Sequence, residues 1–210
     1  GFFSGLSARF NEAGIAYGSF AGDALIAAGA AGAPPVSAAA FGELAAEAAR
    51  AASEPLSFRT GQADGEFHEA AGLAGGSVAS LNWGAAVSAA FAAMDGAPAQ
   101  HAEPGAPRRG LDHGLGASAS VAERWSLVVR LFDPQAAAEA SPRTVVQLVS
   151  LCAEIAEGQG ALLENAAQDD KGLILVLALL RDSEAEAGAL RETLLQALAG
   201  LGIPAKAVTA

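Results

Sequence analysis

The stretch Gly172-Leu-Ile-Leu-Val-Leu-Ala-Leu-Leu180 is a continuous apolar run, and it decides the fold. A turn signal, Gln168-Asp-Asp-Lys-Gly172, comes before it, and Arg181-Asp182 follows it. Because the run has no polar alternation, it is typical of a strand buried on both faces at the centre of a sheet. It is also too short to cross a bilayer as a helix. We therefore expect the second half of the chain to be built around this strand.

The segments around the central strand alternate between strand and helix signals. Two helix starts are marked, by Ser141-Pro142 and by the capping box Ser183-Glu-Ala-Glu186. Gly158 and Gly200 mark the expected helix ends. In chain order we expect a strand over 125–132, a helix from Pro142 to Gly158, an edge strand over 161–166, the central strand, a second helix, and a closing strand over 203–208.

This order is βαββαβ over about 90 residues, which is the split-βαβ or ferredoxin-like pattern. Its strands are expected in the order 4-1-3-2, which places the two longest and most apolar strands side by side in the middle. The sequence therefore predicts an α/β (α+β) protein with a ferredoxin-like C-terminal sandwich over residues 121–210.

The first 96 residues predict a smaller α/β domain. Phe2, Phe3, Leu6 and Phe10 share one face of a helix that Gly14 ends. The elements expected after it are strands over 15–20 and 24–28, a helix capped by Ser37, strands over 56–60, 67–73 and 77–83, and a helix capped by Asn82. The topology of this series resembles that of roadblock and longin-like modules, and the resemblance implies a docking platform.

Residues 97–120 have the composition of a linker. The stretch from Asp95 to Ser120 contains three prolines and five glycines, and its large apolar residues are Leu111 and Leu115. It also holds Arg108-Arg109, the one adjacent basic pair in the chain. We interpret this pair as solvated linker, with a protease-sensitive site or a docking motif for an acidic partner as alternatives.

Charge and cysteine content narrow the class of partner. The net charge is −11 and no basic stripe exists, so neither nucleic acid nor an anionic membrane surface is an expected partner. The uncharged stretches 24–42 and 70–94 are long enough to cross a membrane, but they are rich in Ala, Gly and Ser and lack flanking cations. A single cysteine, Cys152, and no basic signal-peptide region favour a cytoplasmic protein.

A search for catalytic, cofactor and metal residues finds no motif. Cys152 falls on the inward stripe of a helix, where a thiol is inert. His101 and His113 lie near Glu103 and Asp112 in the linker, but their spacing matches no common metal-ligand pattern. The glycine-rich stretches lack the lysine of a phosphate-binding loop. We therefore expect no cofactor, no metal and no catalytic residue that a local motif reveals.

The remaining function class is a non-catalytic interaction or assembly module. A small α/β sandwich leaves one sheet face and two edges free for a protein partner or for a homo-oligomer. The first alternative is a small-molecule sensor, and the second is an enzyme whose site is assembled from scattered residues. The residues expected on the interaction surface are Arg130 and Glu164 on the sheet, Leu162 and Val208 at its edges, and Arg108 and Arg109 in the linker.

Overall fold

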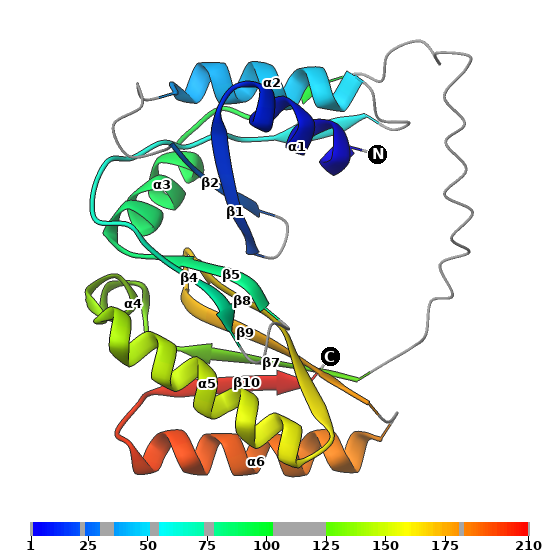
Figure 1. The fold of residues 1–210 in the computed structure, drawn as a ribbon, viewed down its shortest axis with the longest axis vertical. Helices are drawn as coiled ribbons and strands as arrows, with labels where there is room; N and C mark the ends of the chain where they lie inside the picture. The colour runs from blue at the N-terminus through cyan, green and yellow to red at the C-terminus, as the bar shows by residue number, and fades with distance from the viewer. Residues whose placement is uncertain are drawn as a thin grey trace. The chain divides into compact units, whose positions relative to one another are not determined.

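A computed structural model describes residues 2–21, 24–29, 36–50, 55–73, 78–102, 125–180 and 183–209 (Figure 1). The chain is a mixture of helix and sheet and folds into two compact units. Unit 1 comprises the described residues of 1–17, 27–62 and 92–122, and unit 2 those of 18–26, 63–91 and 123–210. Strands β1 (Ile15–Ala21) and β2 (Ala24–Gly29) pair with each other and have residues in both units.

In unit 1, helix α1 (Phe2–Glu12) packs against helix α2 (Ala38–Arg50). The expected apolar face of α1 is confirmed at Leu6 and Phe10, which are buried. The ring of Phe10 meets that of Phe41 edge-on at 5.4 Å, and the Arg9 guanidinium contacts Glu47 at 3.1 Å. Gly14 ends α1 in the left-handed conformation, and the Ser37 hydroxyl accepts the Ala40 amide at the start of α2, both as expected.

A short antiparallel pair, β3 (Leu56–Phe58) with β6 (Gln100–Ala102), also belongs to unit 1. Strand β6 lies inside the stretch whose composition predicts linker. It has no alternation of large apolar residues, so no strand pattern marks it in the sequence. Its Gln100 side chain lies against the backbone of α2, because a Cβ at Gly42 would come within 2.8 Å of it. Residues 103–120 lie outside the described part of the chain.

Unit 2 is built on a four-stranded antiparallel sheet, and its strand order is the one expected from the sequence. Across the sheet the order is β10 (Ala205–Thr209), β7 (Ser126–Leu131), β9 (Gly172–Leu179) and β8 (Ala161–Asp169). Helix α5 (Pro142–Gly158) packs along β8, and α6 (Glu184–Gly200) packs along β10. The core between the helices and the sheet contains the leucines of β9 at 173, 175, 177 and 179, each at most 1% exposed.

The expectation that β9 is buried on both faces is only half met. Its Leu side chains lie under the helices, whereas Ile174 and Val176 point to the other face and are half-buried. The reason is that α5 and α6 pack on one face of the sheet, with buried residues that join the same core as Leu127, Val129 and Leu131 of β7. The opposite face of the sheet is called the open face below.

The polar caps of unit 2 follow the sequence closely. Ser141 and Ser183 each accept a backbone amide at the start of α5 and α6. Two features differ from expectation. Asp133 caps a short extra helix, α4 (Pro134–Glu139). The left-handed glycines after α5 and α6 are Gly160 and Gly202, each two positions beyond the expected Gly158 and Gly200. Helix α4 was not predicted, because its 6 residues are too few to show a helical repeat of apolar positions.

A hairpin of β4 (His68–Leu73) and β5 (Val78–Trp83) lies beside β8 in unit 2 (Figure 1). It adds Leu73, Val78, Leu81 and Trp83 to the core. The expected N-cap at Asn82 is wrong. Asn82 is a buried residue of β5, and helix α3 (Ala85–Asp95) begins only after Gly84.

At Gly172 the start of β9 packs closely against the backbone at the end of β7. The φ of Gly172 is +124°, and a Cβ there would overlap the carbonyl oxygen of Phe132 and lie 3.1 Å from that of Leu131. A side chain at this position would therefore push the two central strands apart.

We expect Gly172→Ala to lower the free energy of unfolding by at least about 2 kcal/mol, because it adds a left-handed strain to a backbone clash. Gly158→Ala is the matched control, since a Cβ at Gly158 meets nothing within 4 Å. That variant should change stability by no more than about 1 kcal/mol. Urea denaturation followed by circular dichroism measures the free energy of unfolding of both variants. Equal stability of the two variants would contradict the close approach of the strands at Gly172.

Candidate functional site

The strand register places two rows of side chains across the open face. Residues directly opposite each other on antiparallel strands point to the same side of a sheet. The first row is Val208, Val128, Val176 and Asn165, and the second is Lys206, Arg130, Ile174 and Ala167. The open face therefore has an apolar row in its middle and a row with two cations beside it.

On this surface the most exposed apolar side chain lies at the β10 edge, whereas Ala167 at the β8 edge is fully buried. Val128, Val176 and Ile174 are half-buried in the middle, whereas Val208 on β10 is 66% exposed and Leu162 on β8 is 39% exposed. Single exposed apolar residues are ordinary on a protein surface. Here Val208, Val128 and Val176 belong to one row that crosses three strands of the sheet, whereas Leu162 lies in a separate row, opposite Ala178. A continuous row of this kind is suited to contact with a partner.

Arg130 is already engaged within the chain. Its guanidinium donates to both carboxylate oxygens of Asp169, with Nη2 at 2.8 Å from Oδ2, and the Asp169 Oδ1 also accepts the Lys171 amide at 2.8 Å. The two side chains are 26% and 15% exposed. This bidentate pair neutralises the charge of Arg130 and ties β7 to the β8–β9 turn. Arg130 thus holds the turn in place on the open face.

The structure does not bring the expected surface residues into one cluster. Leu162 and Glu164 lie on β8 and Val208 lies on β10, at opposite edges of the four-stranded sheet, with Arg130 on β7 between them. Glu164 is exposed at the register shift between Leu163 and Asn165. Arg108 and Arg109 lie outside the described residues.

A buried polar cluster around Gln168 was not predicted. Gln168 is fully buried; its Oε1 accepts the Gly84 amide at 2.8 Å, and its Nε2 donates to the Ser88 hydroxyl at 2.5 Å. The Glu66 carbonyl accepts the Ala86 amide at 3.0 Å, and a Cβ at Gly84 would lie 2.5 Å from that carbonyl. These bonds fix the start of α3 against β8. In the sequence, Gln168 resembles an ordinary turn residue, so only the fold reveals its role.

His68 and Trp83 face each other across the β4–β5 hairpin. Their ring centroids are 5.3 Å apart at an interplanar angle of 37°, and His68 Nε2 lies 3.1 Å from the exposed carboxylate of Glu66. Trp83 is 1% exposed, and its indole N–H has no hydrogen-bond partner among the described residues. The pairing is therefore mainly a packing contact that orients the hairpin.

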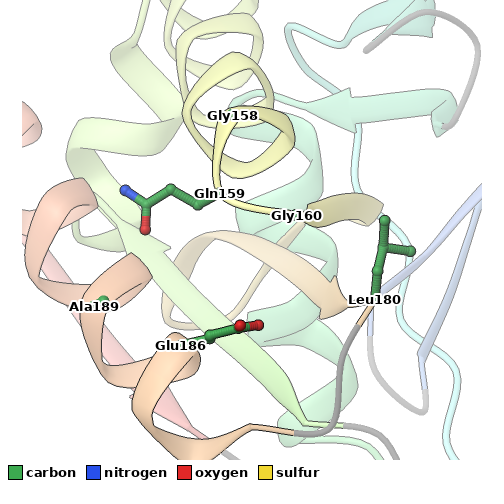
Figure 2. A pocket seen from close by; sticks show the side chains of 6 residues that line it. All are labelled: Gly158, Gln159, Gly160, Leu180, Glu186 and Ala189. Carbon is green, nitrogen blue, oxygen red and sulfur yellow. The ribbon is translucent and has the colours of Figure 1, made fainter.

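A pocket of about 450 Å³ lies between the end of α5 and the start of α6 (Figure 2). Small residues leave the space open, and its one charged lining side chain is Glu186, which Figure 2 shows on the α6 side. The lining residues are Gly158, Gln159, Gly160, Leu180, Glu186 and Ala189. The pocket has room for a small molecule, but it holds few polar groups to orient one.

Comparison of the chain with protein-family models, with curated proteins and with solved structures found no match. Within the described residues, no helix combines the length and the apolar character that crossing a membrane requires. The same residues contain no group of three His, Cys, Asp or Glu side chains placed to hold a metal ion. Of the linker residues weighed as metal ligands, His101 is exposed on β6, and the others fall outside the described ranges.

Replacing the buried amide by an apolar group should weaken unit 2. Gln168→Leu leaves the Gly84 amide buried without an acceptor, so we expect a loss of about 1–3 kcal/mol in the free energy of unfolding. Gln196→Leu, on the exposed face of α6, is the control and should stay within about 0.5 kcal/mol of the parent. Hydrogen exchange at Gly84 should accelerate only in the first variant; an unchanged rate there would refute the role of Gln168.

Cys152 is fully buried on α5, and desolvation raises the pKa of its thiol to about 12. At pH 8 the thiolate fraction is then on the order of 10⁻⁴, against about a tenth or more for an unfolded cysteine. We expect iodoacetamide to modify the native chain at least about a hundredfold more slowly than the urea-unfolded chain. Mass spectrometry of timed samples measures both rates, and similar rates would show that the thiol is accessible.

Proposed function

We propose that this protein is a non-catalytic interaction or assembly module that binds another protein through the open face and the edges of its C-terminal sheet. In this proposal the βαββαβ segment over 121–210 is a ferredoxin-like domain, and residues 1–96 are a docking region of roadblock- or longin-like topology. Part of that region, residues 18–26 and 63–91, belongs to the same compact unit as the C-terminal sheet. The protein works in the cytoplasm. The observation that carries the proposal is the apolar row of Val208, Val128 and Val176 on a sheet face that α5 and α6 leave uncovered.

Burial of that row supplies a driving force for binding. Covering a valine side chain fully contributes about 1.5 kcal/mol or more. Val208 has most of its surface left to bury, and its half-buried neighbours have part of theirs. A partner with a complementary apolar strip therefore gains most at the β10 side of the face.

The charges around the row favour a protein partner over a highly charged polymer. Arg130 and Asp169 neutralise each other, which leaves Lys206 as the one other charged side chain in the two rows. The open face is thus close to neutral, although the chain as a whole carries −11. A near-neutral patch on an acidic chain lets an acidic or neutral protein approach without strong repulsion.

We expect Val128→Lys to abolish binding through the open face without unfolding the chain, because a lysine on this half-buried face can extend its charge to solvent in the unbound state. Val128→Thr keeps the shape of the side chain and is the control. The tagged parent and both variants are incubated with extract of the source cells, and retained proteins are quantified by mass spectrometry. At least one protein should be retained by the parent and by Val128→Thr and fall at least tenfold with Val128→Lys. Identical retention by all three would overturn the proposal.

The pocket between α5 and α6 supports a second candidate, a small-molecule sensor. A ligand that binds there raises the unfolding temperature by mass action. A metabolite panel screened by thermal shift tests it, with Ala189→Trp as a variant that fills the pocket. A shift seen in the parent and lost in the variant would favour the sensor.

A further inference from the structure

We infer that strand β10 pairs with β10 of a second copy of this chain, antiparallel, across a twofold axis at Ala207. The two four-stranded sheets then form one continuous eight-stranded sheet. The inference rests on the proposed function, since it names a second copy as one partner of the sheet edge.

Strand β10 has one strand neighbour, β7, among the described residues, so its other edge is unpaired there. One contact shows which residues of β10 bond to β7 and which face the free edge. The Phe132 amide donates to the Pro204 carbonyl at 3.2 Å. Because bonded and non-bonded pairs alternate in an antiparallel ladder, Lys206 and Val208 bond to β7. The amides and carbonyls of Ala205, Ala207 and Thr209 therefore point to the free edge.

This hydrogen-bonding pattern allows few registers in which β10 can pair with β10 of a second copy. Outward-facing residues must pair with outward-facing residues, so the twofold axis lies at Lys206, Ala207 or Val208 if at least three residues of each strand overlap. An axis at Lys206 or Val208 leaves part of β10 unpaired, and the first of these also places Lys206 directly opposite its copy. An axis at Ala207 pairs all 5 residues of the strand. It is the register that uses every free backbone group.

Side-chain chemistry favours the same register. With the axis at Ala207, Lys206 lies opposite Val208 of the second copy, on the open face, as a close non-bonded pair. The aliphatic stem of Lys206 then covers a valine that is 66% exposed in the single chain. No like charges stand opposite each other, and the edge strand carries no acidic residue, although the chain is strongly acidic.

The helix layer adds a second contact near the axis. Glu186 lines the pocket at the end of α5, so that side of α6 faces α5. Leu195 follows nine residues later, about half a turn around the helix, and it is half-buried on the side away from α5. Counted from Ile203 in the connection between α6 and β10, Leu195 lies about 12 Å back along the helix at 1.5 Å per residue, and Ala207 lies about 13 Å along the strand at 3.3 Å per residue. Leu195 is therefore expected at about the level of Ala207. The two copies of Leu195 therefore approach each other above the paired strands.

The contact is short. Strands of this length overlap over about 17 Å, which is less than the span of a standard protein interface. We therefore expect a weak dimer whose population depends on concentration and rises over the micromolar range.

Sedimentation velocity of the full chain from about 1 to 200 μM tests the pairing. The parent should shift from monomer to dimer over this range. Ala207→Pro removes an outward amide without removing a bond to β7, a position where an edge strand tolerates proline. It should weaken the dimer at least tenfold, whereas Ala207→Ser, which keeps the amide, should stay close to the parent. A parent that is monomeric throughout, or a dimer unaffected by Ala207→Pro, would overturn the inference.

Engineered disulfides test the register, including the case in which Ala207→Pro does not fold. The double variant Lys206→Cys/Val208→Cys should form a cross-linked dimer under mild oxidation, because each new thiol faces the other position of the second copy. If Lys206→Cys alone cross-links, the twofold axis lies at Lys206. If Val208→Cys alone cross-links, the axis lies at Val208. Either outcome would refute the stated register. The buried native Cys152 remains in place.

This outcome is separable from that of the proposed function. A monomeric chain that still loses a retained protein in Val128→Lys would refute only the self-pairing. A dimer that forms as described, with no protein lost in Val128→Lys, would refute the role of the open face and leave the self-pairing supported.

Discussion

The burial of four leucines of β9 under α5 and α6 holds unit 2 together. Strand β9 is paired on both sides, and each of these leucines is at most 1% exposed. Every neighbour is placed relative to this strand: β7 and β8 by backbone bonds, and the helices by the apolar surface they must cover. The close approach of Gly172 to the Phe132 carbonyl brings the β7 and β9 chains together where β9 begins.

The same constraint explains why the other sheet face is open. Helices α5 and α6 cover one side of the sheet, and the buried Ala137 of α4 joins the same core. On the other side, Val128 and Val176 stay half-buried and Val208 is exposed. Alternating side chains then leave an apolar row half-exposed. The Arg130–Asp169 pair limits the charge on that surface, so the face is suited to contact with another protein more than to a charged ligand.

A second constraint is the buried amide of Gln168. It accepts from Gly84 and donates to Ser88, and so it joins the β4–β5 hairpin and the start of α3 to the end of β8. An amide can satisfy a donor and an acceptor at once without bringing a charge into the core. Together with the core contacts of Leu73, Val78, Leu81 and Trp83, these bonds join residues 63–91 to the same compact unit as the C-terminal sheet.

The sequence by itself determined the elements of unit 2 and their order. Apolar runs, the serine caps and the glycine stops are local signals, since each depends on residues a few positions apart. It also placed Cys152 on the inward side of a helix and Val208 at an edge of the sheet. Only the tertiary structure decided the rest. The engagement of Arg130 by Asp169 and the role of Gln168 depend on residues about 40 to 80 positions apart, and no local pattern encodes such contacts. Strand β6 and the buried position of Asn82 depend likewise on a partner strand, because a short or polar segment adopts β structure only where a neighbour supplies its hydrogen bonds.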